Sequence, residues 1–393
     1  MRLTNVVAFC LGDIPSAKVG IVEIMNYLQH EQFINFQFYL TAQLTKEILA
    51  EADIIISIRS ADSYELDIIK ECKRLGKLVI YYLDDDLLNI PLDATSKDYF
   101  NTEMVRKNII TIINNSDFLL TNNIHIKRKY ESFVNKRAVI IDAPALLIKE
   151  VAIEKHSENE RECIKIGFSG GIDHKTNIEK FLKRPLNDLK AKYKDGISFE
   201  FMGAEPDLGA LNYKFIPYKT NYEEYIQEMK NIHWDIGIAI LPASDFHASK
   251  YFNKYLEYGA IGAAGIYSDV EPYRFVVKNE INGLLVENTE DGWFHGLSYL
   301  IDNTVLRRTI AINSRLHLEE KFSVSKIASD CIGELNDLVT FRAQHCNPNE
   351  IKLNLGSNKL LFSKVFNIFK SMGYKAPVYI IKKIIEKMWK NNK

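Results

Sequence analysis

The sequence contains few cysteines and no extended apolar run, and both scarcities narrow the classes of protein to consider. Its 393 residues include five cysteines, which are scattered, odd in number and without a C-x-x-C pair. This pattern argues against a disulfide framework and a cysteine zinc site, and it is typical of a reducing compartment. No run of about 18 apolar residues occurs, so no transmembrane helix is predicted.

Charge is balanced over the whole chain but not along it. The net charge of −1 gives no reason to expect nucleic acid as a partner. Residues 351–393 hold ten lysines and one glutamate, a net charge of +9, whereas the preceding residues carry −10. The first residues lack the pattern of a signal peptide, so we expect a cytoplasmic protein. The basic tail adds peripheral attachment to the inner face of a membrane as an alternative.

The hydrophobic content of 47% is high enough for two folded cores, and the length favours two domains of roughly 150–180 residues. Short apolar runs alternate with amphipathic stretches, which is typical of βαβ units around a parallel sheet. Residues 151–162 are polar and charged, so we interpret them as a linker. The predicted domains are 1–150 and 163–340, followed by a basic amphipathic tail over 341–393.

Six strands are predicted in each half. They are Val6–Cys10, Phe36–Leu40, Ile54–Ile58, Leu78–Leu83, Phe118–Thr121 and Ala138–Ile141, then Ile164–Ser169, Phe199–Met202, Lys214–Ile216, Ile236–Ile240, Gly265–Ser268 and Gly283–Val286. Helical patterns lie between strands of the first half, at Val19–His30, Ser63–Leu75 and Met104–Asn114. No internal repeat or low-complexity tract accompanies this alternation.

The segment 250–273 combines residue types that can hold a nucleotide. Lys250, Lys254 and Glu257 share a short predicted helix, and a glycine-containing turn, a strand and the polar loop 270–273 follow. A carboxylate can accept hydrogen bonds from two ribose hydroxyls, while lysines offset phosphate charge. Backbone N–H groups can complete a phosphate site. The alternative is an amphipathic helix with solvated lysines.

A glycine-containing loop follows the first predicted strand of the second domain. Ser169, Gly170 and Gly171 precede His174, Lys175 and a predicted helix. Small residues allow a phosphate to approach the backbone, and a helix N-terminus adds partial positive charge.

Two segments of the first domain come at carboxyl ends of predicted strands, where open α/β sheets bind ligands. The first contains Ser16 and Lys18, and its alternative reading is an ordinary loop with Ser16 as a helix cap. The second is Asp84-Asp85-Asp86. Three acids suggest a metal site, but carboxylates also bind sugar hydroxyls and can hold one ready for attack.

These segments, in this order, resemble the GT-B glycosyltransferases, in particular the retaining family called GT4. The family patterns are "I-P-S-A-x-x-R-I", "G-x-x-G-S-x-x-H-x-x-D" and "W-D-I-G-I-A-P-L … F-N-x-x-K-S-x-x-K-x-x-E-Y". The chain supplies, in register with the last pattern, Trp234, Asp235, Phe246, Lys250, Lys254, Glu257 and Tyr258. His247 replaces an Asn, Tyr251 replaces a Ser, and Ser249 stands where the first Glu of E-x7-E is usual.

The resemblance implies an α/β protein of GT-B architecture, with two Rossmann-like domains facing a central cleft. It implies a nucleotide-sugar donor and, as acceptor, a cell-surface glycan or a lipid-linked saccharide, with no bound metal or other cofactor. The residues it implies are Lys250, Lys254, Glu257 and His174 for catalysis; Ser169, Gly170, Gly171, Lys175, His247, Val270, Glu271, Pro272 and Tyr273, together with Glu257, for the donor; and Ser16, Lys18, Asp84, Asp85 and Asp86 for the acceptor side.

Alternatives stay open at this point. The strand alternation by itself fits a periplasmic-binding-protein-like or an epimerase-like pair of domains equally well. Ser249 favours a catalytically silent partner in a glycan-assembly complex, and two Rossmann-like domains also suit a regulatory protein that binds a sugar or nucleotide.

Residues 376–390 of the tail predict a basic amphipathic helix. Its apolar stripe consists of Val378, Ile381, Ile384, Ile385 and Met388, and lysines lie off the stripe. Such a helix is attracted to an anionic membrane surface by about 1 kcal/mol per lysine. The alternative is that its apolar face packs on the protein itself.

Overall fold

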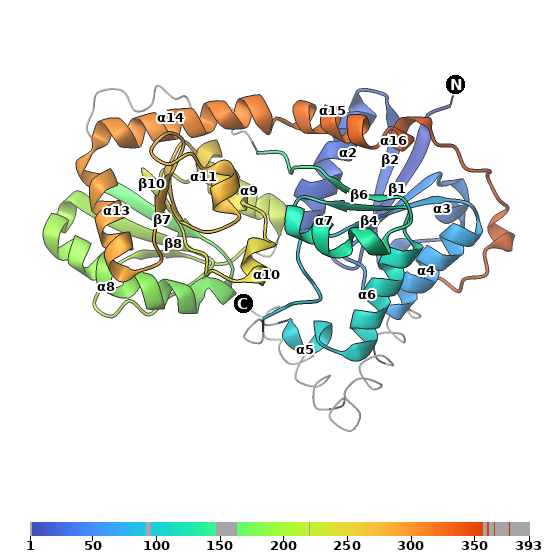
Figure 1. Ribbon diagram of the computed structural model, residues 1–393, viewed down its shortest axis with the longest axis horizontal. Helices are drawn as coiled ribbons and strands as arrows, with labels where there is room; N and C mark the ends of the chain where they lie inside the picture. Colours follow the sequence, from blue (N-terminus) through green and yellow to red (C-terminus); the bar gives the residue numbers. More distant parts are fainter. Residues whose placement is uncertain are drawn as a thin grey trace. The chain divides into compact units, whose positions relative to one another are not determined.

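The chain forms two compact units, which Figure 1 shows. The computed structural model describes residues 2–91, 96–146, 163–219 and 221–356, together with residues 360, 365 and 377. Unit 1 comprises Met1–Asp13, Met25–Ile141 and Cys331–Lys393, and unit 2 comprises Ile14–Ile24 and Asp142–Asp330. The predicted linker 151–162 and, apart from Pro377, the segment 376–390 lie outside the described residues. Each unit therefore includes a segment that is distant in sequence from its main part.

Unit 1 is a parallel six-stranded sheet with helices between successive strands. Its strands are β1 (Thr4–Cys10), β2 (Ile34–Leu40), β3 (Ile54–Ile58), β4 (Leu78–Tyr82), β5 (Phe118–Thr121) and β6 (Arg137–Ile140). Its helices are α2 (Glu23–His30), α3 (Lys46–Glu51), α4 (Ser63–Arg74), α5 (Lys97–Phe100), α6 (Glu103–Asn115), α7 (Ile124–Tyr130) and α16 (Asp337–Thr340). Helix α15 (Val324–Glu334) begins in unit 2 and ends in unit 1. The strand order β2-β1-β3-β4-β5-β6 places the topological switch point between β1 and β3.

Unit 2 repeats this architecture. Its strands are β7 (Ile164–Ser169), β8 (Ile197–Met202), β9 (Lys214–Ile216), β10 (Ile236–Ala239), β11 (Ala264–Ser268) and β12 (Leu284–Val286). Its helical segments are α1 (Pro15–Ala17), η1 (Lys18–Val22), η5 (Ile172–His174), α8 (Lys175–Tyr193), α9 (Tyr222–Lys230), α10 (Asp245–Ala248), α11 (Asn253–Ala260), α12 (Tyr273–Val276), α13 (Glu290–Asp302) and α14 (Thr304–Lys321). The order β12-β11-β10-β7-β8-β9 puts the switch point between β7 and β10.

All twelve predicted strands are confirmed, with ends that differ by at most two residues. The reason is visible in β3, whose sequence Ile-Ile-Ile-Ser-Ile is buried throughout. Strands of a parallel sheet that is covered on both faces are continuous apolar runs, so their first and last residues are easy to recognise in the sequence. In unit 2, helices α8 and α13 pack together over one face of the sheet, while α11 packs against α14 over the other (Figure 1).

Helix α4 begins at the predicted Ser63, but the cap is the preceding residue. The Asp62 carboxylate accepts a hydrogen bond from Tyr64 N at 2.8 Å. The Glu65 side chain in turn accepts from Asp62 N at 3.3 Å, which completes a capping box. Gly76, with φ +69, follows the end of the helix, where the left-handed conformation favours glycine.

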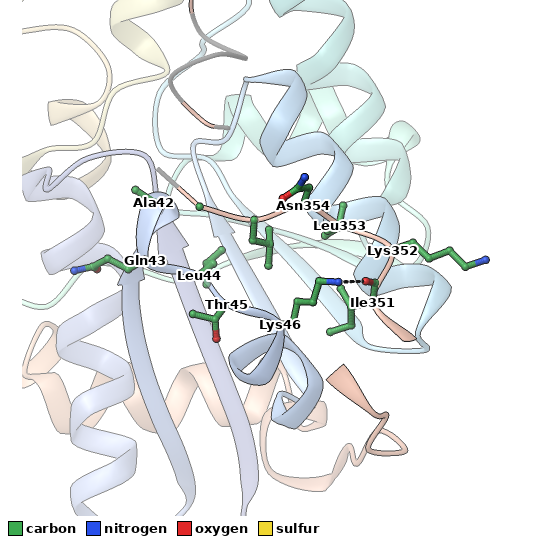
Figure 2. Close-up of a pocket in the computed structure, with 11 residues that line it drawn as sticks. Ala42, Gln43, Leu44, Thr45, Lys46, Ile351, Lys352, Leu353 and Asn354 are labelled. Carbon is green, nitrogen blue, oxygen red and sulfur yellow. Dashed lines mark hydrogen bonds between the residues drawn. The ribbon is translucent and has the colours of Figure 1, made fainter. Parts of the chain in front are cut away.

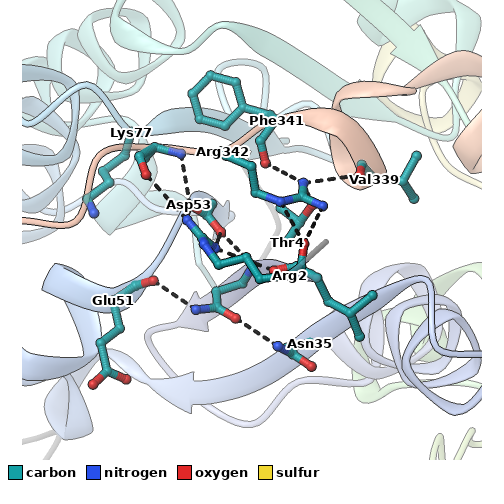
Figure 3. A network of polar contacts seen from close by, with 12 residues as sticks. Arg2, Thr4, Asn35, Glu51, Asp53, Lys77, Val339, Phe341 and Arg342 are labelled. Atoms are coloured by element: carbon teal, nitrogen blue, oxygen red, sulfur yellow. Dashed lines mark hydrogen bonds and ion pairs between the residues drawn. The ribbon is translucent and has the colours of Figure 1, made fainter.

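The C-terminal part of unit 1 is fastened to the start of the chain by a buried polar network (Figure 3). Asp53 is fully buried and accepts hydrogen bonds from the Arg2 guanidinium at 2.7 Å and from Ala343 N at 2.8 Å. Arg342 donates to the carbonyl of Arg2 at 2.8 Å. Burial opposes the charge of Asp53, but Arg2 and backbone N–H donors lower its pKa overall. A paired carboxylate therefore joins residues that are almost 300 positions apart.

Of the residues that the structure describes, none belongs to a helix long and apolar enough to cross a membrane.

Candidate functional site

The predicted donor residues Ser169, Lys254 and Glu257 meet at the switch point of unit 2. Ser169 ends β7, and its hydroxyl donates to Oε2 of Glu257 at 3.0 Å. Lys254 Nζ lies 2.6 Å from the same oxygen. The Glu257 side chain keeps 24% of its surface exposed, so a ligand can reach this carboxylate.

Tyr258 fixes the orientation of Glu257. The Tyr258 ring is fully buried, and its hydroxyl donates to the carbonyl of Ile238 in β10 at 2.6 Å. A Cβ on Gly237 would lie 2.6 Å from the ring, so glycine is needed beneath it. Because Tyr258 is anchored in the core, the preceding side chain is directed to the end of β7.

The loop after β7 rests directly on the loop after β8. Gly170 N donates to the carbonyl of Met202 at 3.0 Å. Gly203 has φ +86, and a Cβ there would lie 2.2 Å from the Gly170 carbonyl oxygen. A Cβ on Gly171, in contrast, would meet no atom within 4 Å. The backbone at Gly171 is therefore open on that side, as a phosphate- or sugar-binding loop requires.

His174 is held as a neutral imidazole. Its ring makes an edge contact with Phe168, with 5.6 Å between the ring centroids. Burial, with the positive charges of Lys254 and Lys250, lowers the pKa of His174 to about 3. Near neutral pH the ring can hold a hydroxyl in place, but it carries no extra proton to give. This environment fits a residue that positions a hydroxyl, and the predicted part of His174 in catalysis stays a prediction.

Helix α10 ends at Ala248, and Lys250 lies between it and the start of α11 at Asn253. The prediction that Lys250 shares one helix with Lys254 and Glu257 is therefore wrong, because the helix begins after Lys250. Lys250 Nζ lies 4.6 Å from the centroid of the Phe246 ring, a cation–π distance. His247 Nδ1 lies 2.7 Å from the hydroxyl of Ser244. Ser249 is fully buried, and its hydroxyl donates to the carbonyl of Asp245 at 2.9 Å. The position of the usual first glutamate thus closes a helical turn and offers the site no carboxylate.

Of the remaining predicted donor residues, Tyr273 is brought near Glu257, whereas Lys175 forms an ion pair within its own helix. Tyr273 follows Val270-Glu271-Pro272 after β11 and is almost completely buried. Burial raises its pKa, and the negative charge of Glu257 adds to this effect. Lys175 begins α8 and forms an ion pair of 3.7 Å with Glu179 of the same helix.

Ser16 and Lys18, predicted for the acceptor side, belong to unit 2. Val19 packs against the apolar core of unit 2, and Lys18 Nζ lies 3.3 Å from Oε1 of Glu223 on α9. The alternative that Ser16 caps a helix is wrong, because Ile14 occupies the cap position of α1 and Ser16 lies inside it. Ser16 and Lys18 therefore lie in the same unit as the predicted donor residues, and the three aspartates lie in unit 1.

Two of those aspartates are bound by one arginine. Arg59 follows β3 with φ +50, a left-handed conformation that is uncommon for a residue with a side chain. Its guanidinium donates to Asp84 and, at 2.8 Å, to Asp85. Most of the surface of both carboxylates is covered, and their charge is partly offset by this contact.

Asp86 is fully buried and accepts from the Tyr130 hydroxyl, the Lys129 ammonium and the Asn89 amide, the last at 2.9 Å. It joins the loop after β4 to α7 and presents no surface to a substrate. Within the described part of the chain, no three His, Cys, Asp or Glu side chains are grouped so that they could hold a metal ion.

Tyr222 and Tyr225 on α9 were not predicted from the sequence. Burial raises the pKa of Tyr222, with further contributions from the charges of Glu257 and Glu23. The signal in the sequence is Asn221, whose side chain caps α9 by accepting from Glu224 N at 3.0 Å. A helix starting there places both tyrosines on one face, three residues apart.

A cavity of ≈ 630 Å³ lies in unit 1 between Ala42–Lys46 and Ile351–Gly356 (Figure 2). Lys46 Nζ donates to the carbonyl of Ile351 at 2.8 Å across it. None of the predicted site residues lines this cavity.

Solved structures with the same arrangement of elements identify the fold. The HepE protein of Anabaena in complex with UDP-glucose is 13% identical, with a TM-score of 0.59 over 86% of this chain and 100% of that chain. Sucrose-phosphate synthase of Thermosynechococcus elongatus is 12% identical, with a TM-score of 0.59 over 85% and 98%. The chain has the GT-B fold.

A glycosyltransferase of Rickettsia africae has the same fold at 14% identity, with a TM-score of 0.57 over 86% of this chain and 100% of that chain. No protein-family model matches the sequence, and no curated protein sequence matches it significantly. At these identities the likeness concerns the fold, and it confirms the predicted GT-B class.

Proposed function

We propose that this protein is a nucleotide-sugar-dependent glycosyltransferase that retains the configuration of the transferred sugar, as GT4-like enzymes do. The observation that carries the proposal is the Glu257 carboxylate, reachable from solvent and held by Ser169 and Lys254 at the switch point of unit 2. Solved HepE structures of the same fold contain UDP or UDP-glucose, which supports a nucleotide sugar as the ligand.

In the proposed reaction Glu257 accepts hydrogen bonds from the two ribose hydroxyls of the donor. The bond between the sugar C1 and the diphosphate oxygen breaks, and a bond from C1 to the acceptor oxygen forms on the same face. The proton of the acceptor hydroxyl passes to the leaving diphosphate. Lys250 and Lys254 offset the negative charge that grows on this diphosphate. His174 stays neutral and positions a hydroxyl, and the reaction needs no protein base and no bound metal.

The proposed acceptor is a growing cell-surface glycan or a lipid-linked saccharide. The resemblance to GT4 enzymes and the charge of +9 over residues 351–393 support it. Basic residues 376–390 would then hold the protein on the inner face of an anionic membrane. Sedimentation with vesicles containing phosphatidylserine tests this: changing Lys382, Lys383, Lys387 and Lys390 to Gln should weaken binding by about 1 kcal/mol per lysine. Equal binding of both proteins would rule out the basic segment as the anchor.

The first test of the function is thermal stabilisation by UDP, GDP, dTDP and CDP. A ligand at 100 times its dissociation constant should add about 2.7 kcal/mol to the free energy of unfolding. We expect one base to stabilise the protein, and Glu257→Ala and Lys250→Ala to abolish the effect. The matching nucleotide sugars should then be turned over in the presence of a glycan acceptor. Absence of stabilisation by all four nucleotides would overturn the donor-site assignment.

A second candidate is a catalytically silent partner in a glycan-assembly complex. Ser249 favours it, because this residue is buried and its hydroxyl donates a hydrogen bond to the carbonyl of Asp245. This candidate predicts nucleotide binding without cleavage of any donor. Turnover that disappears in Glu257→Ala would exclude it.

A further inference from the structure

Helix α14, which is orange in Figure 1, has apolar residues on two opposite sides. The side that packs on α11 and β11 consists of Ile310, Ala311, Ser314, Arg315 and Leu318, all of them buried. On the other side Val305, Ile312 and Leu316 are exposed, Val305 by 77% and Leu316 by 51%. The outer side of a surface helix is ordinarily polar, so this second apolar stripe points to an interaction surface.

Two neighbouring segments widen the stripe. Asn313 on α14 donates to the carbonyl of Ile281 at 2.9 Å, and the Ile281 residue is 53% exposed. Tyr299 on α13 is exposed too, and its hydroxyl lies 3.3 Å from Oε2 of Glu280. Single apolar residues are common on a protein surface, whereas a group of them drawn from adjacent segments marks a place where another molecule binds.

One row of side chains across this surface has a simple charge pattern. It consists of Arg308, Ile312, Leu316 and Glu320, which are exposed and follow one another at a spacing of four residues. Residues at this spacing are neighbours on a helix and form a ridge. The ridge starts with a cation, continues with two apolar side chains and ends with an anion, so its two ends are complementary to each other.

The other charges near the ridge have partners within unit 2. Glu320 lies 2.8 Å from Lys321, and Glu319 lies 2.8 Å from the Arg315 guanidinium. Exposed ion pairs contribute little, so an arginine from another molecule can compete for Glu320. The two glutamates would be repelled by an anionic membrane, which favours a protein partner with a cation at the matching place.

We propose that α14 is a surface on which two copies of this protein associate, with their α14 helices antiparallel about a two-fold axis. Ile312 of each copy then lies opposite Leu316 of the other, and Arg308 lies opposite Glu320. A two-fold axis makes every contact occur twice, which requires a self-complementary surface. One helix face buries less than the about 800 Å² per partner of a standard interface, so we expect a dissociation constant of about 10 µM. The inference goes beyond the proposed function and does not depend on it.

Sedimentation equilibrium of the full chain, at concentrations from about 1 to 100 µM, tests the association. The wild type should pass from monomer to dimer over this range. Leu316→Glu should weaken the dimer at least about tenfold, because it brings a carboxylate into the apolar centre. The matched control is Phe133→Glu at an exposed apolar residue of unit 1, which should associate like the wild type. Equal melting temperatures of the three proteins at low concentration verify that the variants are folded.

Exchanging the charges tests the antiparallel arrangement. Arg308→Glu and Glu320→Arg should each weaken the dimer at least about tenfold, since each variant places like charges opposite each other at both ends. The double variant should associate as the wild type does. An equimolar mixture of the two single variants should form a heterodimer, because opposite charges meet again at both ends.

A wild type that stays monomeric throughout this range would overturn the inference, and so would a dimer that Leu316→Glu leaves intact. Failure of both the double variant and the mixture to restore the dimer would also overturn it, because the pairing of Arg308 with Glu320 defines the surface. Binding of the monomeric wild type to phosphatidylserine vesicles, lost in Leu316→Glu, would show a membrane surface instead. Nucleotide binding enters none of these measurements, so their failure leaves the proposed function standing.

Discussion

The two sheets are both parallel and six-stranded, although their strand orders differ, and the charged groups at their carboxyl edges give opposite electrostatics. In unit 1, Arg59 binds Asp84 and Asp85, and Lys129 binds the buried Asp86. In unit 2 a single carboxylate, Glu257, has Lys254 at 2.6 Å. The pKa of His174 is lowered by burial and by the positive charges of both Lys254 and Lys250.

This difference shows that carboxylates at the ends of parallel strands can be either enclosed or accessible, depending on the charges around them. The Asp86 side chain has none of its surface exposed, whereas that of Glu257 retains 24%. Carboxylates that are largely buried and already paired with cations have a structural role. Two lysines around one reachable carboxylate leave positive charge for an anion such as a diphosphate.

The largest expected effect concerns the two lysines of unit 2. Replacing Lys250 and Lys254 together by Ala should weaken UDP binding by about 1,000-fold, because each charged contact is worth about 2 kcal/mol. Uridine, which has no phosphate, should bind the variant as it binds the wild type. Calorimetry with both ligands checks this, and the exposed pair Lys183→Ala and Lys192→Ala is the control. An equal loss for uridine would mean that the lysines do not act on phosphate.

The two edges should also differ in stability when a cation is removed. Arg59→Ala leaves two largely covered carboxylates without their partner and should cost about 2–4 kcal/mol. Lys254→Ala removes the partner of one carboxylate, which keeps the hydroxyl of Ser169, and should cost less, about 1 kcal/mol. Urea unfolding measures both. A Lys254→Ala loss as large as that of Arg59→Ala would show that this pair too is structural, and would remove the contrast.

A smaller effect follows from the neutral state of His174. Its pKa of about 3 in the folded protein lies below its ordinary value of 6.5, so only the unfolded chain takes up a proton between these values. Stability should therefore fall as the pH drops below 6.5, with about 2 kcal/mol lost through this group by pH 4.5.

The variant His174→Gln should show a shallower fall over the same range, while His295→Gln on α13 should follow the wild type. Unfolding free energies at pH 4.5 and 7 are the measurement. Parallel pH profiles for the wild type and His174→Gln would mean that burial and the neighbouring lysines do not suppress protonation at this site.

The smallest expected effect is that of a chelator. Because lysines offset the leaving diphosphate in the proposed reaction, EDTA should change donor turnover by less than about twofold. The assay compares turnover with EDTA and with added Mg²⁺ or Mn²⁺. Activity that returns only with a metal ion would show that the lysines are not sufficient to offset the charge of the leaving diphosphate.

Much of the fold could be predicted because its signals are local. The run Ile54–Ile58 and the helix starting at Ser63 depend on neighbours in sequence, and both are where the sequence predicts them. The association of Ile14–Ile24 with unit 2 was not predicted, since it depends on Val19 reaching a core formed by distant residues. The return of the chain to unit 1 likewise depends on Arg342 meeting the carbonyl of Arg2.

For the candidate site, the sequence by itself determined which residues were predicted to carry the chemistry. The spacing of Lys254 and Glu257 puts them on one helical face, and Ser169 ends a recognisable strand. Only the tertiary structure decided how each charge is used. Arg59 neutralises acids 25 positions away through a left-handed backbone turn, and Tyr225 lies by a carboxylate 32 positions later. Such contacts depend on how strands order and helices pack, and no local pattern records them.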